Sequence, residues 1–190
     1  MRRTPIAIAS ASLLVPLFAV IGSGLPAATA AACESDTPPT YAGEVPTGDE
    51  VPGIGFPIGS QETTAAQIEI YLAAVDAASD DVRLGSFGTS AEGRPLTYAV
   101  VGSRADVAAA KRAAQQLRDP RTTPAAAARI ARTSPAIVWM AGNVHGGEES
   151  GGDAALAMLR DLADRTDCAA TKIRDNTVTV IIPTQNPDGR

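Results

Sequence analysis

At 190 residues and 45% hydrophobic content, the chain is long enough for one ordinary globular domain. Its 16 basic and 21 acidic residues give a net charge of -5. This balance predicts neither an electrostatic footprint for nucleic acid nor a polybasic patch for a membrane surface. We therefore expect no nucleic-acid partner.

Residues 1–32 have the pattern of a signal peptide. Arg2 and Arg3 form a charged start, an apolar stretch follows, and Ala28-Thr29-Ala30 offers small residues for cleavage. A transmembrane anchor is the alternative, but the apolar stretch contains Pro16 and is shorter than the roughly 20 residues that span a bilayer. The pattern predicts a secreted protein without stable membrane insertion after signal removal.

Export places Cys33 and Cys168 in an oxidising compartment, where disulfides form and persist. A bridge between them would close a long loop and contribute roughly 5 kcal/mol in the chain-entropy model. Pairing with a cysteine outside this chain is equally compatible with the sequence, so both alternatives stay open.

Residues 33–63 are rich in Pro, Gly, Thr and acidic residues, which predicts a linker or an irregular N-terminal arm. The folded part is expected to begin at Thr64. Thr64 and Gln67 have the spacing of a capping box, and the following helix, with an apolar face, is expected to end near Ser79.

Helices and apolar strands alternate over the rest of the chain. Strands are predicted at 82–88, 96–101, 136–141 and 177–182, and helices after the cap residues Ser103, Thr123 and Ser150. This order predicts an α/β fold with a mixed, mostly parallel sheet flanked by helices. Because residues 136–141 are uniformly apolar, we expect them to form a central strand covered on both faces, with Trp139 in the core.

The loop after residues 136–141 holds the only histidine of the chain, His145, and three residues later Glu148. Imidazole nitrogen and carboxylate oxygen both bind zinc, and a spacing of three places both side chains on one side of a helical turn. Catalytic zinc sites commonly combine two His with one Glu, and this loop supplies one of each. The same spacing also fits a surface loop with a carboxylate near a helix N-terminus, where Glu149 would complement the helix dipole.

Three stretches together resemble the zinc metallocarboxypeptidase family, of the carboxypeptidase A, B and T type. In chain order they are Gly88-Thr89-Ser90-Ala91-Glu92-Gly93-Arg94, His145-Gly146-Gly147-Glu148 and Asn186-Pro187-Asp188-Gly189. The resemblance covers residues 64–190 and implies the N-terminal half of such a catalytic domain. Its sheet would be incomplete, with an exposed edge and uncovered apolar faces.

The resemblance implies one Zn²⁺ ion bound by His145 and Glu148, and hydrolysis of C-terminal bonds of a peptide substrate by zinc-activated water. The third zinc ligand, the arginines and the general-base glutamate of the family would lie beyond Arg190. No catalytic or substrate-binding residue is therefore assigned, and the chain by itself is expected to be inactive. Arg94 is expected to pair near its hairpin, and Asn186-Pro187-Asp188-Gly189 to have a structural role.

Two other functions remain open. A zinc deacylase of the desuccinylase or aspartoacylase type has a similar H-G-x-E opening, although export and the E-G-R hairpin argue against it. A non-catalytic secreted module would keep the fold without the complete site. A later histidine, an Asn-Arg pair and a glutamate beyond Arg190 would favour the peptidase.

Overall fold

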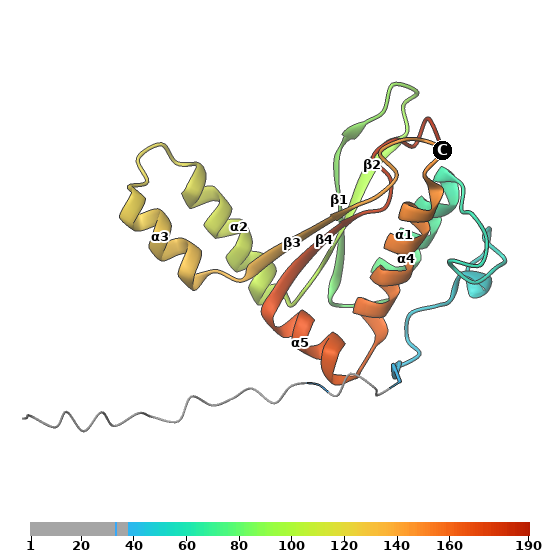
Figure 1. Cartoon of the computed structure of the whole chain (residues 1–190), viewed down its shortest axis with the longest axis horizontal. Helices are drawn as coiled ribbons and strands as arrows, with labels where there is room; N and C mark the ends of the chain where they lie inside the picture. The colour runs from blue at the N-terminus through green and yellow to red at the C-terminus, as the bar shows by residue number, and fades with distance from the viewer. Residues whose placement is uncertain (1–32, 34–37) are drawn as a thin grey trace, which may run out of the picture. The chain divides into compact units, whose positions relative to one another are not determined.

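The computed structural model describes Cys33 and residues 38–190, so the signal peptide predicted at residues 1–32 lies outside the described residues. Four strands form one sheet in the order β1-β2-β4-β3 (Figure 1). The strands are β1 (Val82–Thr89), β2 (Pro95–Val101), β3 (Ala136–Ala141) and β4 (Thr177–Ile182). The helices are α1 (Ala65–Ala78), α2 (Arg104–Arg118), α3 (Pro124–Thr133), α4 (Glu149–Asp164), α5 (Cys168–Asn176) and the short 3-10 helix η1 (Gly48–Glu50).

The sheet is mixed and flanked by helices, which confirms the predicted α/β class. β1 pairs antiparallel with β2, β2 pairs antiparallel with β4, and β3 pairs parallel with β4. Parallel pairs are therefore not the majority among the described strands, contrary to expectation. The turn at residues 90–94 is too short for a crossover, so it joins β1 and β2 as a hairpin.

β3 is an edge strand in the described part of the chain, where β4 alone pairs with it. The side chains of Ile137, Val138 and Trp139 are 53%, 41% and 60% exposed. The prediction of a central strand with Trp139 in the core is therefore wrong, whereas the expected exposed edge and uncovered apolar face are observed. Apolar composition indicates that a strand favours burial, but it does not determine which segments pack against the strand.

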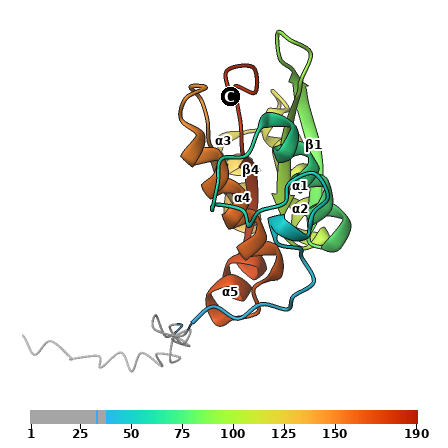
Figure 2. The same ribbon diagram turned by 90° about the vertical axis from the view of Figure 1, so that its right-hand side faces the viewer.

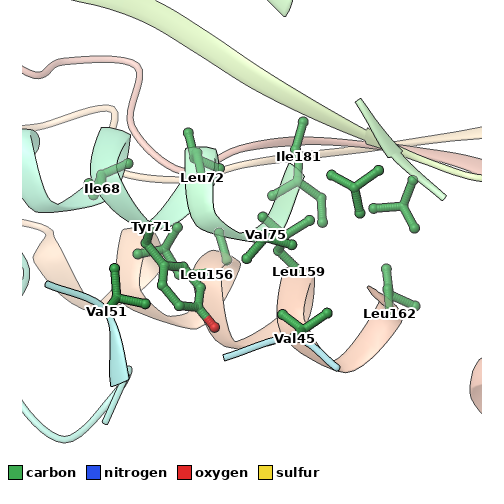
Figure 3. Close-up of a cluster of buried hydrophobic side chains, with 14 of the residues drawn as sticks. Val45, Val51, Ile68, Tyr71, Leu72, Val75, Leu156, Leu159, Leu162 and Ile181 are labelled. Atoms are coloured by element: carbon green, nitrogen blue, oxygen red, sulfur yellow. The ribbon is translucent and has the colours of Figure 1, made fainter. Parts of the chain in front are cut away.

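Helices α1 and α4 pack on one face of the sheet, and α2 and α3 lie on the other side (Figures 1 and 2). The apolar face of α1 is fully buried, through Ile68, Tyr71, Leu72 and Val75. It meets the apolar face of α4 and one face of the strands in a single cluster, whose labelled members appear in Figure 3. Burial raises the pKa of Tyr71 to about 12, and its hydroxyl donates to the carbonyl of Pro46 at 3.1 Å.

Residues 38–63 belong to the same packed unit, although they form little regular structure. Val45, Val51 and Ile54 are buried in the core cluster. The Asp164 carboxylate of α4 accepts hydrogen bonds from the backbone N–H groups of residues 43–45, at 3.2, 2.9 and 3.1 Å. These contacts hold the segment against α4.

Three helices begin after the cap residue predicted from the sequence, and one does not. Thr64 and Gln67 form the predicted capping box, and the side chains of Ser103 and Thr123 cap α2 and α3. Ser150 does not cap α4, because the helix already begins at Glu149 with Glu148 as its cap residue. Asp153 lies three residues after Ser150, the spacing of a capping box, but it accepts a hydrogen bond from the Thr63 hydroxyl at 2.5 Å instead.

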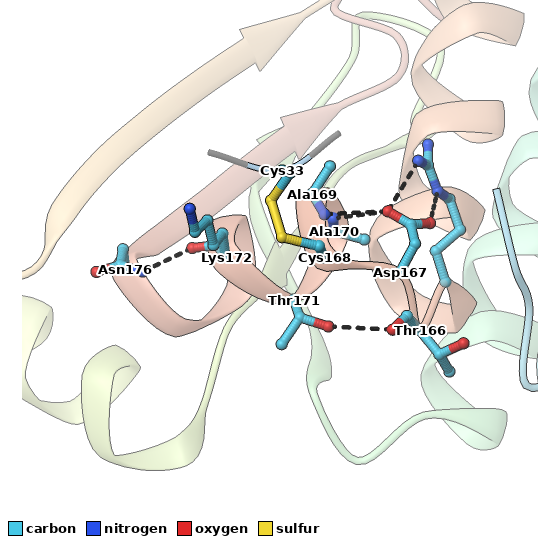
Figure 4. Close-up of a disulfide and its surroundings, with 10 residues drawn as sticks. Cys33, Thr166, Asp167, Cys168, Ala169, Ala170, Thr171, Lys172 and Asn176 are labelled. Atoms are coloured by element: carbon cyan, nitrogen blue, oxygen red, sulfur yellow. Dashed lines mark hydrogen bonds and ion pairs between the residues drawn. A yellow bond between two sulfur atoms is a disulfide. The ribbon is translucent and has the colours of Figure 1, made fainter. Parts of the chain in front are cut away.

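The structure pairs Cys33 with Cys168, one of the two alternatives left open by the sequence, with Cα atoms 5.6 Å apart (Figure 4). Cys168 opens α5, a helix that the sequence analysis did not predict. Asp167 caps α5 by accepting from the backbone N–H groups of Ala169 and Ala170. Hydrogen bonds from Arg165 are the main reason why the pKa of Asp167 lies well below its usual range.

Basic residues outnumber acidic ones along α2 and α3, although the net charge of the whole chain is negative. Seven basic and two acidic residues lie between Arg104 and Arg132, and all seven basic side chains are exposed. Arg104 and Arg121 pair with Asp80 and Asp119, and the expectation of no polybasic patch stays a prediction. The absence of a nucleic-acid partner stays a prediction.

Among the described residues, no helix has the length and apolar character needed to cross a membrane.

We predict that Leu159→Ala lowers the free energy of unfolding by about 2–5 kcal/mol, because it removes a fully buried side chain from the core cluster. Met158→Ala on the same helix is the matched control, since Met158 is 39% exposed; we expect a loss of about 1 kcal/mol or less. Urea unfolding followed by circular dichroism measures both. Equal losses would contradict the placement of Leu159 in the core.

Candidate metal centre

His145 and Glu148 lie in the loop between β3 and α4, and their side chains face each other. His145 Nδ1 is 3.0 Å from Glu148 Oε1, and the two side chains are 78% and 61% exposed. The backbone N–H of Glu148 donates to the carbonyl of His145 at 3.0 Å, which closes the turn between them. The hydrogen bond from the imidazole is the main cause that lowers the pKa of Glu148.

The geometry of this pair fits two ligands of one zinc ion. Two donors that bind tetrahedral zinc at about 2.1 Å lie roughly 3.4 Å apart. Nδ1 and Oε1 are 3.0 Å apart, so a separation of a few tenths of an ångström more would admit the ion in place of the direct hydrogen bond. Both side chains are accessible from solvent. Within the described residues, no group of three or more His, Cys, Asp or Glu side chains is arranged to hold a metal.

The Asn-Pro-Asp-Gly turn after β4 packs directly on the loop that bears His145 and Glu148. The backbone N–H groups of Gln185 and Asn186 donate to the carbonyls of Gly142 and Asn143, at 3.3 and 3.2 Å. A Cβ atom on Gly146 would overlap the carbonyl of Gly189. This position therefore needs glycine for close approach between the two segments, rather than for an unusual backbone angle.

Asp188 joins the same turn to the β1–β2 hairpin. Its carboxylate accepts from the Ser90 hydroxyl at 2.7 Å, from the backbone N–H of Glu92 at 3.0 Å and from Arg94 Nη1 at 2.5 Å. The bond from Ser90, followed by that from Arg94, lowers the pKa of Asp188. Arg94 also pairs with Glu92 at 2.5 Å, so the expected pairing of Arg94 near its hairpin is confirmed. The three stretches that are far apart in the sequence thus form one contiguous network.

Arg190, which follows the turn, reaches a buried cluster at the start of α4. Its side chain is 1% exposed and its Nη2 lies 2.9 Å from Asp153 Oδ1. It also donates to the Thr63 carbonyl at 2.6 Å and to the Glu149 carbonyl at 3.1 Å. Because every one of these contacts is internal, Arg190 is a structural residue in the described chain. Neither Arg190 nor Asp153 was predicted from the sequence to have this role.

Asn143 is a third residue whose role was not predicted from the sequence. Asn143 is 3% exposed and lies two residues before His145. Its side-chain amide contacts the carbonyl of His145 and the hydroxyl of Thr184, which follows β4. An Asn after a glycine at a strand end reads as an ordinary turn, so the sequence carries no signal that separates this residue from other loop asparagines.

A hollow of about 410 Å³ lies beside α4 and is lined by residues 59–62, Ser150, Asp153, Ala154 and Ala157. Neither His145 nor Glu148 lines it. The hollow is therefore separate from the side chains of the His145–Glu148 pair.

Comparison with known proteins identifies the family. The sequence profile of the zinc carboxypeptidase family matches residues 68–190. This match spans more than half of the chain, so the chain belongs to the zinc carboxypeptidase family. The resemblance drawn from the three stretches is confirmed. No curated protein matches the sequence.

The solved structures similar to this chain include the following two. Thrombin activatable fibrinolysis inhibitor (TAFI) shares 16% identity at a TM-score of 0.49, over 68% of this chain and 26% of that one. The carboxypeptidase A from Helicoverpa armigera shares 19% identity at a TM-score of 0.47, over 67% and 25%. The chain thus spans about a quarter of the length of either structure.

We predict a pH-dependent stability contribution from Asp188. Its pKa in the folded chain lies below the ordinary value of 3.8, so its ionised form favours folding above about that pH. The contribution is lost as the pH falls through the folded-state pKa. Asp188→Asn should therefore lower the urea midpoint at pH 7, and the difference from the wild type should shrink below about pH 3.8.

The matched control is Asp175→Asn, which replaces an exposed carboxylate at the end of α5. We expect it to change the midpoint little at either pH. A midpoint difference for Asp188→Asn that is as large at pH 2 as at pH 7 would contradict the charged link between turn and hairpin.

Proposed function

We propose that this chain carries the His-Gly-Gly-Glu part of the zinc site of an exported metallocarboxypeptidase. The observation that carries the proposal is that the hairpin, the loop and the Asn-Pro-Asp-Gly turn, which are distant in the sequence, form one network in the structure. Asp188 binds the hairpin, Gly189 packs against Gly146, and the exposed pair His145 and Glu148 faces solvent beside them. An isolated His-x-x-Glu spacing would not require this support.

In this proposal, His145 and Glu148 are two protein ligands of one zinc ion. Zinc in such a site polarises a peptide carbonyl and activates a water molecule for attack. The residues of this chain would hold the ion, since His145 Nδ1 and Glu148 Oε1 lie 3.0 Å apart, close to the separation of a coordinated pair. The substrate is a peptide, hydrolysed at its C-terminal bond. Hydrolysis of such a substrate is a proposal for the whole protein, of which this chain spans a part.

The disulfide supports export. The bridge between Cys33 and Cys168 is of a kind that persists in oxidising compartments and is rare in reducing ones. It agrees with the signal pattern at residues 1–32, and we propose that the protein acts outside the cytoplasm.

We predict that the 190-residue chain binds Zn²⁺ weakly, because two protein donors face the site in its described part. His145→Ala and Glu148→Ala should each reduce bound zinc to background, whereas Glu149→Ala should retain it. Equilibrium dialysis followed by metal analysis measures this. If Glu149→Ala loses the metal while Glu148→Ala keeps it, the ligand assignment is wrong.

The same preparation tests catalysis. We expect no hydrolysis of a peptide with a free C-terminal carboxylate by this chain alone. Tight zinc binding at one ion per chain, together with peptide hydrolysis that His145→Ala abolishes, would overturn the assignment of an incomplete ligand set.

A further inference from the structure

Asn143 has a backbone conformation that few residues accept. Its φ is +48°, and it is the one non-glycine residue with a positive φ in the described part of the chain. Asparagine tolerates this region better than most residues, while glycine adopts it without steric cost. The conformation alone would therefore favour glycine, so the presence of asparagine needs a second reason.

The side-chain amide supplies that reason, since it bonds two carbonyls of the loop and a hydroxyl of the segment after β4. Nδ2 donates to the carbonyl of His145 at 2.8 Å and to the carbonyl of Gly146 at 3.1 Å. Oδ1 accepts from the Thr184 hydroxyl at 2.7 Å. The orientation of the amide is fixed by chemistry, because two carbonyls require the NH₂ group and the hydroxyl can then donate to the oxygen.

The carbonyl of His145 consequently accepts two hydrogen bonds, one from Asn143 Nδ2 and one from the backbone N–H of Glu148. The first bond fixes the peptide plane of His145, and the second fixes the start of α4 relative to it. Thr184, which is 5% exposed, connects the amide to the segment that follows β4. A buried amide thus bonds the same His145 carbonyl that the backbone N–H of Glu148 bonds.

We propose that Asn143, held by Thr184, is the positioning residue of the His145–Glu148 pair. It sets the separation of the two donor atoms without touching the metal. The inference rests on the proposed metal function, but the ordering of His145 by Asn143 can be measured in the absence of metal.

The test uses the 190-residue chain and its single histidine, whose imidazole gives one set of NMR signals. Asn143→Gly keeps the positive φ and removes the amide. Asn143→Asp keeps the shape and an acceptor for Thr184, but turns a carboxylate oxygen toward two carbonyls. Thr184→Val removes the hydroxyl that anchors the amide.

We expect both Asn143 variants to weaken Co²⁺ binding about tenfold, the size typical when a group that orients a metal ligand is removed. Relaxation of the His145 imidazole Cε1–H group without metal should show lower order in both variants, and Thr184→Val should show a smaller loss of the same kind. Asn176→Ala is the matched control: Asn176 is exposed and donates to the Lys172 carbonyl at the end of α5. It should change neither readout.

Two results would overturn the proposal. One is wild-type imidazole order and wild-type Co²⁺ affinity in both Asn143 variants. The other is an affinity loss explained by a lower urea midpoint, with imidazole order in the folded chain unchanged, which indicates a purely structural role. If the wild type fails to bind Co²⁺ while the Asn143 variants lose imidazole order, the positioning role stands and the metal function fails.

Discussion

The arrangement around the loop that bears His145 and Glu148 depends on the hydrogen bonds that the Asp188 carboxylate accepts. It accepts three hydrogen bonds from the β1–β2 hairpin, while the next residue, Gly189, packs against Gly146 of the loop. One short turn therefore touches both of the other stretches. Because a carboxylate can accept several bonds at once, a single residue joins two segments that no backbone ladder connects. The segment after β4 therefore holds the loop, in addition to the hydrogen bonds within the loop itself.

The buried pair of Arg190 and Asp153 extends this support to the start of α4. A buried ion pair gains little free energy over a well-packed apolar substitute, but breaking it leaves an uncompensated charge. Here the guanidinium also bonds the carbonyls of Thr63 and Glu149, so it fixes the first turn of α4 against residues 38–63. The same helix buries Leu156 and Leu159 in the core. The core thus positions Glu148 through the helix that begins immediately after it.

Much of the candidate site could be read from the sequence, because its residues are chemically distinctive. The lone histidine, the glutamate three residues later and the Asp-Gly turn are each recognisable by composition and spacing. Asn143, Asp153 and Arg190 could not be found in this way. The roles of Arg190 and Asp153 depend on partners between 37 and 127 positions away, and no local pattern encodes such distances. Asn143 bonds the nearby carbonyls of His145 and Gly146, but its third partner, Thr184, lies 41 positions away. The spacing of Asp153 from Ser150 also fits a capping box, but in the structure Asp153 bonds Thr63 instead.

For the fold, the sequence by itself determined the local elements: Thr64, Ser103 and Thr123 cap helices because a side-chain oxygen satisfies a free N–H within one turn. It also determined the hairpin, since a short turn joins only antiparallel strands. The tertiary structure alone decided that β3 lies at an edge with Trp139 exposed, that Cys33 pairs with Cys168, and that the loop bearing His145 and Glu148 is clamped by the turn at Asp188. The physical reason is the separation along the sequence between interacting residues. The hydrogen bonds of caps and turns form within a few residues. Burial, strand and disulfide pairing and close packing depend on which distant segments come into contact.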